Sequence, residues 1–433
     1  MLRGRTITLF AALSLVAMQA FAADYSFSGY GTLGYAQSNK SYAFQRSIDD
    51  GGTLQRDSMA GIQLDARFNS HFGATLQARA APSLGKDNAY AATLAWAFVS
   101  YRPTDDWLVR AGKLRVPLYL YSENTDIGAT FDFARLPTEM YSISPTADFT
   151  GASFRKEWNL ESGDLTLTGF WGGATTTNRF YRRDDSPDGI PEAKAGPFYI
   201  PFTVGAKGVA LTLRRRADTF RLAFAKATAR RVDGGQQFPR TFPFVPLAPG
   251  IGYYKTSTLI PDGVEFPVTE TTDLTVIALG ANVGIGSDLR VIAEYARRMV
   301  RNTEIGLDTH GGYVSLLKRM SDWTFYGTYA YLRSTPGPRN FYNAVNYNRV
   351  PPFIKDATLL NYTQRIGGDL VQAFDQSSWA LGSSYTLTPT SKIKAEFQRV
   401  HIGQMSAMVD APRGSDVRNQ NINVYSLSYS FAF

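Results

Sequence analysis

The sequence contains no cysteine, and its 433 residues include only three histidines, His71, His310 and His401. The absence of cysteine excludes a disulfide framework, an iron–sulfur cluster and a cysteine-based zinc site. Three histidines leave little material for a histidine metal cage or a histidine proton relay. The sequence therefore predicts a protein with no cofactor, no metal site and no evident catalytic residue.

Long hydrophobic runs are also scarce, and the mean hydropathy is −0.20. Residues 7–18 form the one extended apolar run, whereas each helix of a membrane-spanning bundle needs about 20 apolar residues. Arg3 and Arg5 precede this run and Ala20 and Ala22 follow it, which is the pattern of a secretory signal peptide. We therefore expect residues 1–22 to be a cleaved signal peptide. Its removal takes away Arg3 and Arg5 and lowers the net charge of the exported domain, residues 23–433, from +8 to +6.

Aromatic residues are abundant at 13%, which excludes a disordered chain. Much of the sequence alternates between apolar and polar or small residues, as β-strands do. For example, Ile393, Ala395 and Phe397 alternate with Lys394 and Glu396. Sixteen segments of this kind can be counted: 25–36, 59–68, 72–81, 90–103, 107–113, 151–158, 163–172, 204–214, 220–231, 273–283, 289–298, 309–317, 323–332, 378–387, 391–401 and 421–433.

The connections between these segments alternate in length. Every second one has three to five residues, and the others are longer: 37–58, 82–89, 114–150, 173–203, 232–272, 299–308, 333–377 and 402–420. Short turns at one end and long loops at the other are typical of a transmembrane β-barrel. Because hydrocarbon offers no hydrogen-bond partner to a free backbone N–H or C=O group, such a sheet must close on itself. We therefore predict an all-β, sixteen-stranded antiparallel barrel with both termini at the short-turn end and a water-filled lumen.

A soluble β-protein would also show this alternation, but its core would not easily accommodate charged side chains at alternate positions of so many strands. Aromatic residues near the segment ends suit the two interfaces of a membrane instead. These residues are Tyr101, Trp107, Trp158, Trp171, Trp323, Tyr331, Trp379 and Tyr385.

The last residues, Tyr429, Phe431 and Phe433 among them, resemble the closing strand of Gram-negative outer-membrane proteins, in which alternating aromatics and a terminal Phe mark the chain for barrel assembly. With residues 27–35, which resemble a porin first strand, the whole of 23–433 resembles the general bacterial porins. This resemblance implies an outer-membrane location, lipid contact, a homotrimer and a third loop that folds into the lumen. The long loops 232–272 and 333–377 and the basic charge depart from the enterobacterial type, which leaves open the solute preference and whether these loops cover the pore.

The third long loop, residues 114–150, is the predicted constriction. It contributes an acidic group, Glu123, Asp126, Asp132 and Glu139. Five arginines on lumen-facing strand positions supply a basic wall: Arg67, Arg79, Arg110, Arg155 and Arg221. Opposed charges across a narrow wet channel create a transverse field that orders water and favours small polar solutes.

These features predict passive diffusion of small hydrophilic solutes and ions, with no binding of nucleic acid. The positive charge and the arginines near the loop bases suggest an anion preference: Arg179, Arg182, Arg183, Arg230, Arg231, Arg298 and Arg301. A substrate-specific channel for sugar or phosphate is the alternative. An outer-membrane enzyme is the other class, but neither His310 nor His401 has an evident nucleophile motif beside it.

Overall fold

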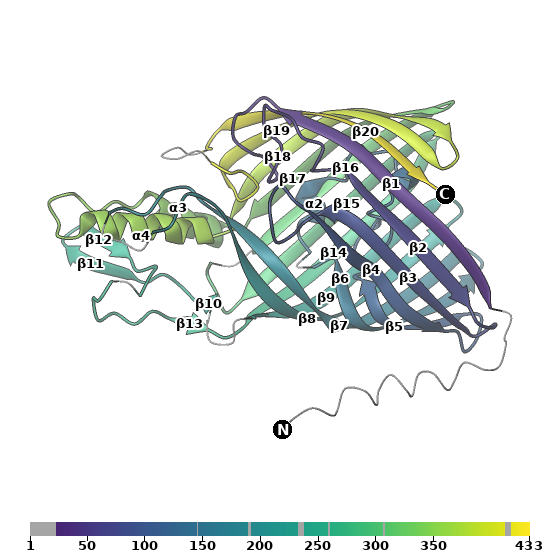
Figure 1. The fold of residues 1–433 in the computed structure, drawn as a ribbon, viewed down its shortest axis with the longest axis horizontal. Coiled ribbons are helices and arrows are strands. Elements are labelled where there is room, and N and C mark those ends of the chain that lie inside the picture. The colour runs from purple at the N-terminus through teal and green to yellow at the C-terminus, as the bar shows by residue number, and fades with distance from the viewer. Residues whose placement is uncertain are drawn as a thin grey trace, which may run out of the picture.

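The computed structural model describes residues 23–144, 146–188, 192–232, 238–258, 260–305, 308–411 and 417–433, so the predicted signal peptide 1–22 lies outside the described residues. Within this part of the chain, sixteen antiparallel strands form one closed barrel (Figure 1), which confirms the predicted fold class. In order around the barrel they are β1 (Asp24–Ser38), β2 (Met59–Arg67), β3 (Phe72–Pro82), β4 (Tyr90–Tyr101), β5 (Trp107–Arg115), β6 (Asp148–Leu160), β7 (Gly163–Arg182), β8 (Gly196–Arg215), β9 (Asp218–Arg231), β14 (Thr272–Gly286), β15 (Leu289–Arg301), β16 (Thr309–Met320), β17 (Trp323–Ser334), β18 (Phe374–Thr388), β19 (Ser391–Ser406) and β20 (Gln420–Ala432).

The barrel closes where the first strand pairs with the last. Leu33 of β1 lies opposite Tyr429 of β20 in an antiparallel register. The backbone N–H groups of Gly29 and Phe433 each donate to the carbonyl oxygen of the other residue, both at 2.9 Å. This pairing satisfies the backbone groups that an open sheet would leave bare in a membrane.

All sixteen predicted segments coincide with barrel strands, and the short connections are confirmed, but β7 and β8 are longer than predicted. Each has 20 residues. The extra residues form a hairpin in which residues 176–182 pair with residues 196–202. The residues of β8 that precede Phe202 pair with no residue of β9. The sequence conceals this hairpin because Pro197 and Pro201 lie in it, and proline normally argues against a strand except at an edge such as this one.

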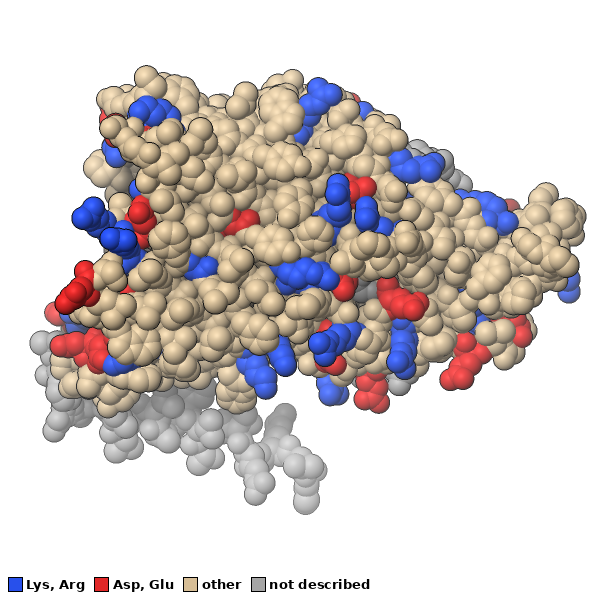
Figure 2. Space-filling view, turned by 180° about the vertical axis from the view of Figure 1, so that it is seen from behind, with Lys and Arg blue, Asp and Glu red and all other residues tan. Residues whose placement is uncertain are grey.

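The outer face of the barrel is apolar. Large apolar side chains are exposed all around it, among them Leu33, Ile62, Leu64, Leu222, Leu316, Leu381 and Leu427. Figure 2 shows one such face, with wide stretches of uncharged residues between scattered charged ones. Apolar surface of this extent is unfavourable in water and matches the hydrocarbon of a membrane. None of the described helices is both long enough and apolar enough to cross a membrane.

The two longest loops fold together beyond the long-loop end of the barrel (Figure 1). The loop between β9 and β14 forms two small sheets, β10 (Phe238–Pro239) with β13 (Val268–Thr269) and β11 (Phe244–Ala248) with β12 (Ile251–Tyr254). The loop between β17 and β18 forms α3 (Pro336–Tyr347) and α4 (Ala357–Leu370). The backbone N–H of Tyr254 donates to Gln364 of α4 at 2.9 Å, and Asn348 donates to the carbonyl of Gly252 at 2.8 Å.

Candidate pore constriction

The third loop, residues 116–147, runs from β5 to β6 and contains η1 (Gly128–Thr130) and α2 (Thr138–Tyr141). Its backbone N–H at Leu120 donates to Glu294 Oε2 of β15 at 2.8 Å. Lys394 Nζ of β19 donates to the carbonyl oxygens of Gly128 at 2.6 Å and Phe133 at 3.0 Å. Both β15 and β19 lie on the far side of the barrel from β5. The loop therefore crosses the lumen, in agreement with the prediction that it folds inward.

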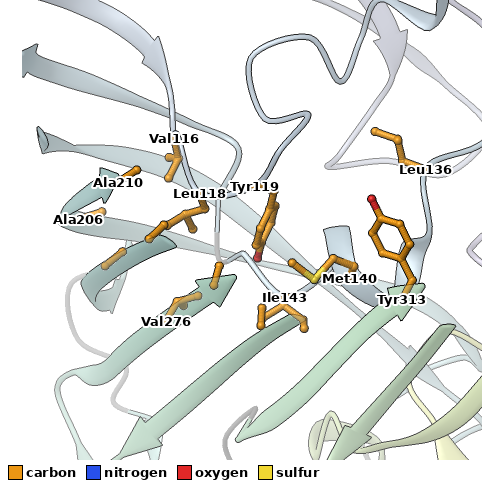
Figure 3. Close-up of a cluster of buried hydrophobic side chains, with 14 of the residues drawn as sticks. Val116, Leu118, Tyr119, Leu136, Met140, Ile143, Ala206, Ala210, Val276 and Tyr313 are labelled. Carbon is orange, nitrogen blue, oxygen red and sulfur yellow. The ribbon is translucent and has the colours of Figure 1, made fainter. Parts of the chain in front are cut away.

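A hydrophobic core lies inside the barrel, between the third loop and the wall. Figure 3 shows Leu118 of the loop facing Ala206, Ala210 and Val276, which are inward residues of β8 and β14, and Ile143 of the loop beside Met140. The alanines leave space beside the wall, and the apolar side chains of the loop fill it. Burial of this surface holds the loop in place, at about 25 cal/mol for each Å² removed from water.

This core corrects one part of the sequence prediction, which expected a water-filled lumen. Lys394 is 1% exposed and Glu294 is 4% exposed, because the third loop covers both. Glu294 accepts hydrogen bonds from the hydroxyls of Tyr141 at 2.6 Å and Tyr313 at 2.9 Å, besides the one from Leu120. A buried carboxylate is tolerated when several donors satisfy it, and here the donors attach the loop to β15 and β16.

A cluster of charged residues remains open to solvent inside the barrel. Arg110 of β5 lies 3.9 Å from Glu123 of the third loop, and the side chain of Glu123 is 47% exposed. Arg155 of β6 pairs with Glu157 at 3.1 Å. Arg221 of β9 donates to the carbonyl of Pro117 at 2.7 Å and also lies within electrostatic range of both Glu123 and Arg155. Three of the five predicted arginines thus gather around one predicted acid.

Two other predicted residues, one basic and one acidic, form a direct ion pair instead of lying on opposite sides of a water-filled channel. Arg79 Nη1 of β3 donates to Asp126 Oδ2 at 2.7 Å, and Arg115 at the end of β5 donates to the same oxygen. All three side chains are mostly buried. Arg115 was a loop residue in the sequence prediction and joins this pair because β5 continues two residues past its predicted end.

The remaining predicted residues lie outside the arginine cluster. Asp132 pairs with Lys392 of β19 at 2.7 Å and accepts a hydrogen bond from Ser384 at 3.1 Å. Glu139 is buried and accepts a hydrogen bond from Gln376 at 3.1 Å. Arg67 ends β2 at the short-turn end and is exposed, and among the described residues it makes no hydrogen bond or ion pair with the third loop. The selectivity roles of all these residues stay predictions.

Of the predicted assembly residues, Tyr429 and Phe431 lie on the last strand, β20, and Phe433 follows it directly. The rings of Tyr429 and Phe431 are 5.8 Å apart, and those of Phe431 and Phe433 are 6.5 Å apart. Their role as a signal also stays a prediction.

The histidines lie apart from this lumen cluster. His310 packs between Tyr295 and Tyr331, and His401 hydrogen-bonds Asn421 at 3.1 Å. Among the described residues, no group of three or more histidine, aspartate and glutamate side chains is arranged to hold a metal ion.

No known protein family and no curated protein matches the sequence, but solved structures share its fold. The outer membrane channel DcaP of Acinetobacter baumannii has a TM-score of 0.51 at 10% identity, over 95% of this chain and 97% of that one. OprB of Pseudomonas putida, in a high-pH structure, has 0.51 at 10% identity over 94% of each chain. An anion-selective porin from Comamonas acidovorans has 0.50 at 11% identity, over 95% of this chain and 100% of that one. At such low identities these likenesses establish the fold alone, which is that of the outer-membrane porins.

Proposed function

We propose that this chain is an outer-membrane porin of a Gram-negative bacterium, through which small hydrophilic solutes and ions diffuse passively. The observation that carries the proposal is solvent-exposed charge inside a closed barrel. Glu123 and Glu157 face the lumen, and their side chains are 47% and 42% exposed. Water therefore reaches the interior beside β5 and β6, while the third loop fills the opposite side. We infer that this water continues past the third loop as a narrow polar passage, which suits small hydrophilic solutes and disfavours apolar ones.

An anion preference is part of this proposal, and it rests on the arginine cluster. Arg110, Arg155 and Arg221 surround Glu123 and Glu157, the two exposed acids, whereas Glu294, a third acid within electrostatic range of Arg221, is buried beneath the third loop. The low-dielectric wall of a narrow channel strengthens the field of such a cluster. Several arginines near the loop bases contribute less than their number suggests, because acids neutralise them. Arg179 pairs with Asp410 at 2.6 Å and Asp87 at 2.7 Å, and Arg183 pairs with Asp369.

Planar-bilayer recordings of the purified protein test both parts. We expect stepwise channel conductance, with a reversal potential in a potassium chloride gradient that favours chloride. Replacing Arg110 and Arg155 with Gln lowers the chloride preference, whereas Arg67→Gln, outside the cluster, leaves it unchanged. A protein that never conducts contradicts the porin proposal, and a cation preference in the wild-type contradicts the anion proposal.

Swelling of liposomes with sugars of increasing size then separates a general pore, with a smooth cut-off, from a sugar-specific one.

We further propose that the protein is a homotrimer. Outward positions on β2, β3 and β4 carry alanines, which allow a neighbouring barrel to approach closely: Ala60, Ala66, Ala74, Ala78 and Ala92. Light scattering of the detergent-solubilised protein measures the mass directly, and a monomer at all protein concentrations contradicts this assignment.

A further inference from the structure

A cavity of about 200 Å³ lies inside the barrel at its long-loop end. Inward residues of β7, β8 and β14 form its wall, Ser142 and Ser144 of the third loop border it, and Leu370 and Gln372 close another side. A solute that enters from the long-loop end meets this cavity beside the third loop. Its volume holds one six-membered ring with a small substituent, since benzene enters an engineered cavity of about 150 Å³.

The lining of this cavity is rich in aromatic rings. Phe180, Phe202, Phe238 and Phe374 all contribute to it. Phe202 and Phe238 are stacked, with ring centroids 5.5 Å apart and planes 19° apart. A flat ring that packs against such a pair gains contact area and favourable stacking geometry. Against these rings the hydroxyls of a sugar would lack partners, although Thr176, Asn178, Thr272 and Thr303 add polar groups elsewhere in the lining.

The polar groups of the cavity point to an anionic ligand. Ser142 Oγ is buried and has no hydrogen-bond partner among the described residues. Arg298 is the only charged residue among the described ones that line the cavity, and the carbonyl of Ile143 holds it at 3.0 Å. A hydroxyl donor and a fixed cation together suit a carboxylate, and no acid among the described residues lines the cavity, although Asp308 lies within electrostatic range of Arg298.

We propose that this cavity binds a single-ring aromatic carboxylate of about the size of benzoate. The proposal rests on the proposed function and deepens it by naming a solute class for the route into the constriction. Binding must be weak enough for the solute to leave again. A ligand of this size is expected to have a dissociation constant on the order of 1 mM.

Two measurements with sodium benzoate test the proposal, with sodium acetate as the matched ligand that lacks a ring. In planar bilayers, benzoate interrupts the ion current with a saturating concentration dependence, and acetate at equal concentration does not. Isothermal titration calorimetry of the detergent-solubilised protein measures benzoate binding without any need for conduction. Equal effects of benzoate and acetate, or no calorimetric binding of benzoate, overturn the proposal.

A pair of variants locates the site. Val204 is 3% exposed and lines the cavity, so Val204→Phe fills the space and is expected to weaken benzoate binding at least about tenfold. Val209 lies on the same strand but faces outward at 45% exposure, so Val209→Phe leaves binding unchanged. Wild-type binding by Val204→Phe overturns the assignment of the site.

A protein that conducts but binds no benzoate refutes this inference alone, and one that binds benzoate but never conducts refutes the porin proposal alone.

Discussion

At the residue scale, one buried ion pair joins the third loop to the first. Arg135 Nε donates to Asp57 Oδ1 at 2.8 Å, and a second Arg135 nitrogen donates to the other carboxylate oxygen. Burial by itself raises the pKa of Asp57, but the attraction and hydrogen bonds of Arg135 outweigh it and hold that pKa below its ordinary value. Removing one partner of a buried pair costs roughly 3–5 kcal/mol.

This pair makes the anchoring of the third loop sensitive to acid. Because the pKa of Asp57 is lower in the folded protein, the pair stabilises the folded state above the ordinary aspartate pKa of about 4, and this contribution is lost as the pH falls further. We expect hydrogen exchange in residues 131–139 to accelerate below about pH 4. Asp57→Asn shows the fast exchange already at pH 7, and Asp50→Asn, an exposed acid of the same loop, does not. Equal exchange in all three proteins contradicts the role of Asp57.

At the element scale, the third loop is attached to the wall by hydrogen bonds that converge on Glu294. Its carboxylate accepts from two hydroxyls and one backbone N–H. Glutamine at this position has one acceptor oxygen, and its amide group is a donor that cannot accept from Leu120. A lost hydrogen bond with an unsatisfied buried group costs about 1–3 kcal/mol.

Glu294→Gln is therefore expected to loosen the third loop. Chymotrypsin cuts the folded variant in this loop faster than the wild-type, and its open-channel current is noisier. Glu157→Gln is the matched control, because Glu157 also faces inward but is exposed, and its side chain pairs with Arg155 of the same strand and not with the third loop. An unchanged cleavage rate in Glu294→Gln contradicts a role of the Glu294 hydrogen bonds in securing the loop.

At the scale of the whole molecule, closure of the barrel and the predicted assembly signal depend on different parts of Phe433: its backbone and its ring. Phe433 contributes two backbone hydrogen bonds to Gly29, which any residue can supply, and an exposed ring, which closure does not need. If the ring is the assembly signal, Phe433→Ala lowers the amount of barrel inserted in cells several-fold but refolds in detergent micelles as the wild-type does. Tyr425→Ala removes another outward ring of the same strand and affects neither. Equal losses for both variants in cells contradict a specific signal.

The sequence by itself determined the barrel. A period of two places each side chain on one of two faces, so the sixteen strands and their apolar outer face follow from local pattern, and connection lengths distinguish the two ends. The local pattern was weakest where prolines lie in an edge hairpin, as in β8, because only the pairing with β7 reveals that strand.

Only the tertiary structure decided what fills the lumen and which charges meet. An inward position looks the same in sequence whether water or the third loop covers it, so Lys394 and Arg110 were indistinguishable until the loop buried one and left the other open. The partners of the acidic residues were equally hidden, since Asp132 pairs with Lys392 across 260 residues of chain. Charge pairing depends on the folded path of a long irregular loop, and no short-range periodicity encodes that path.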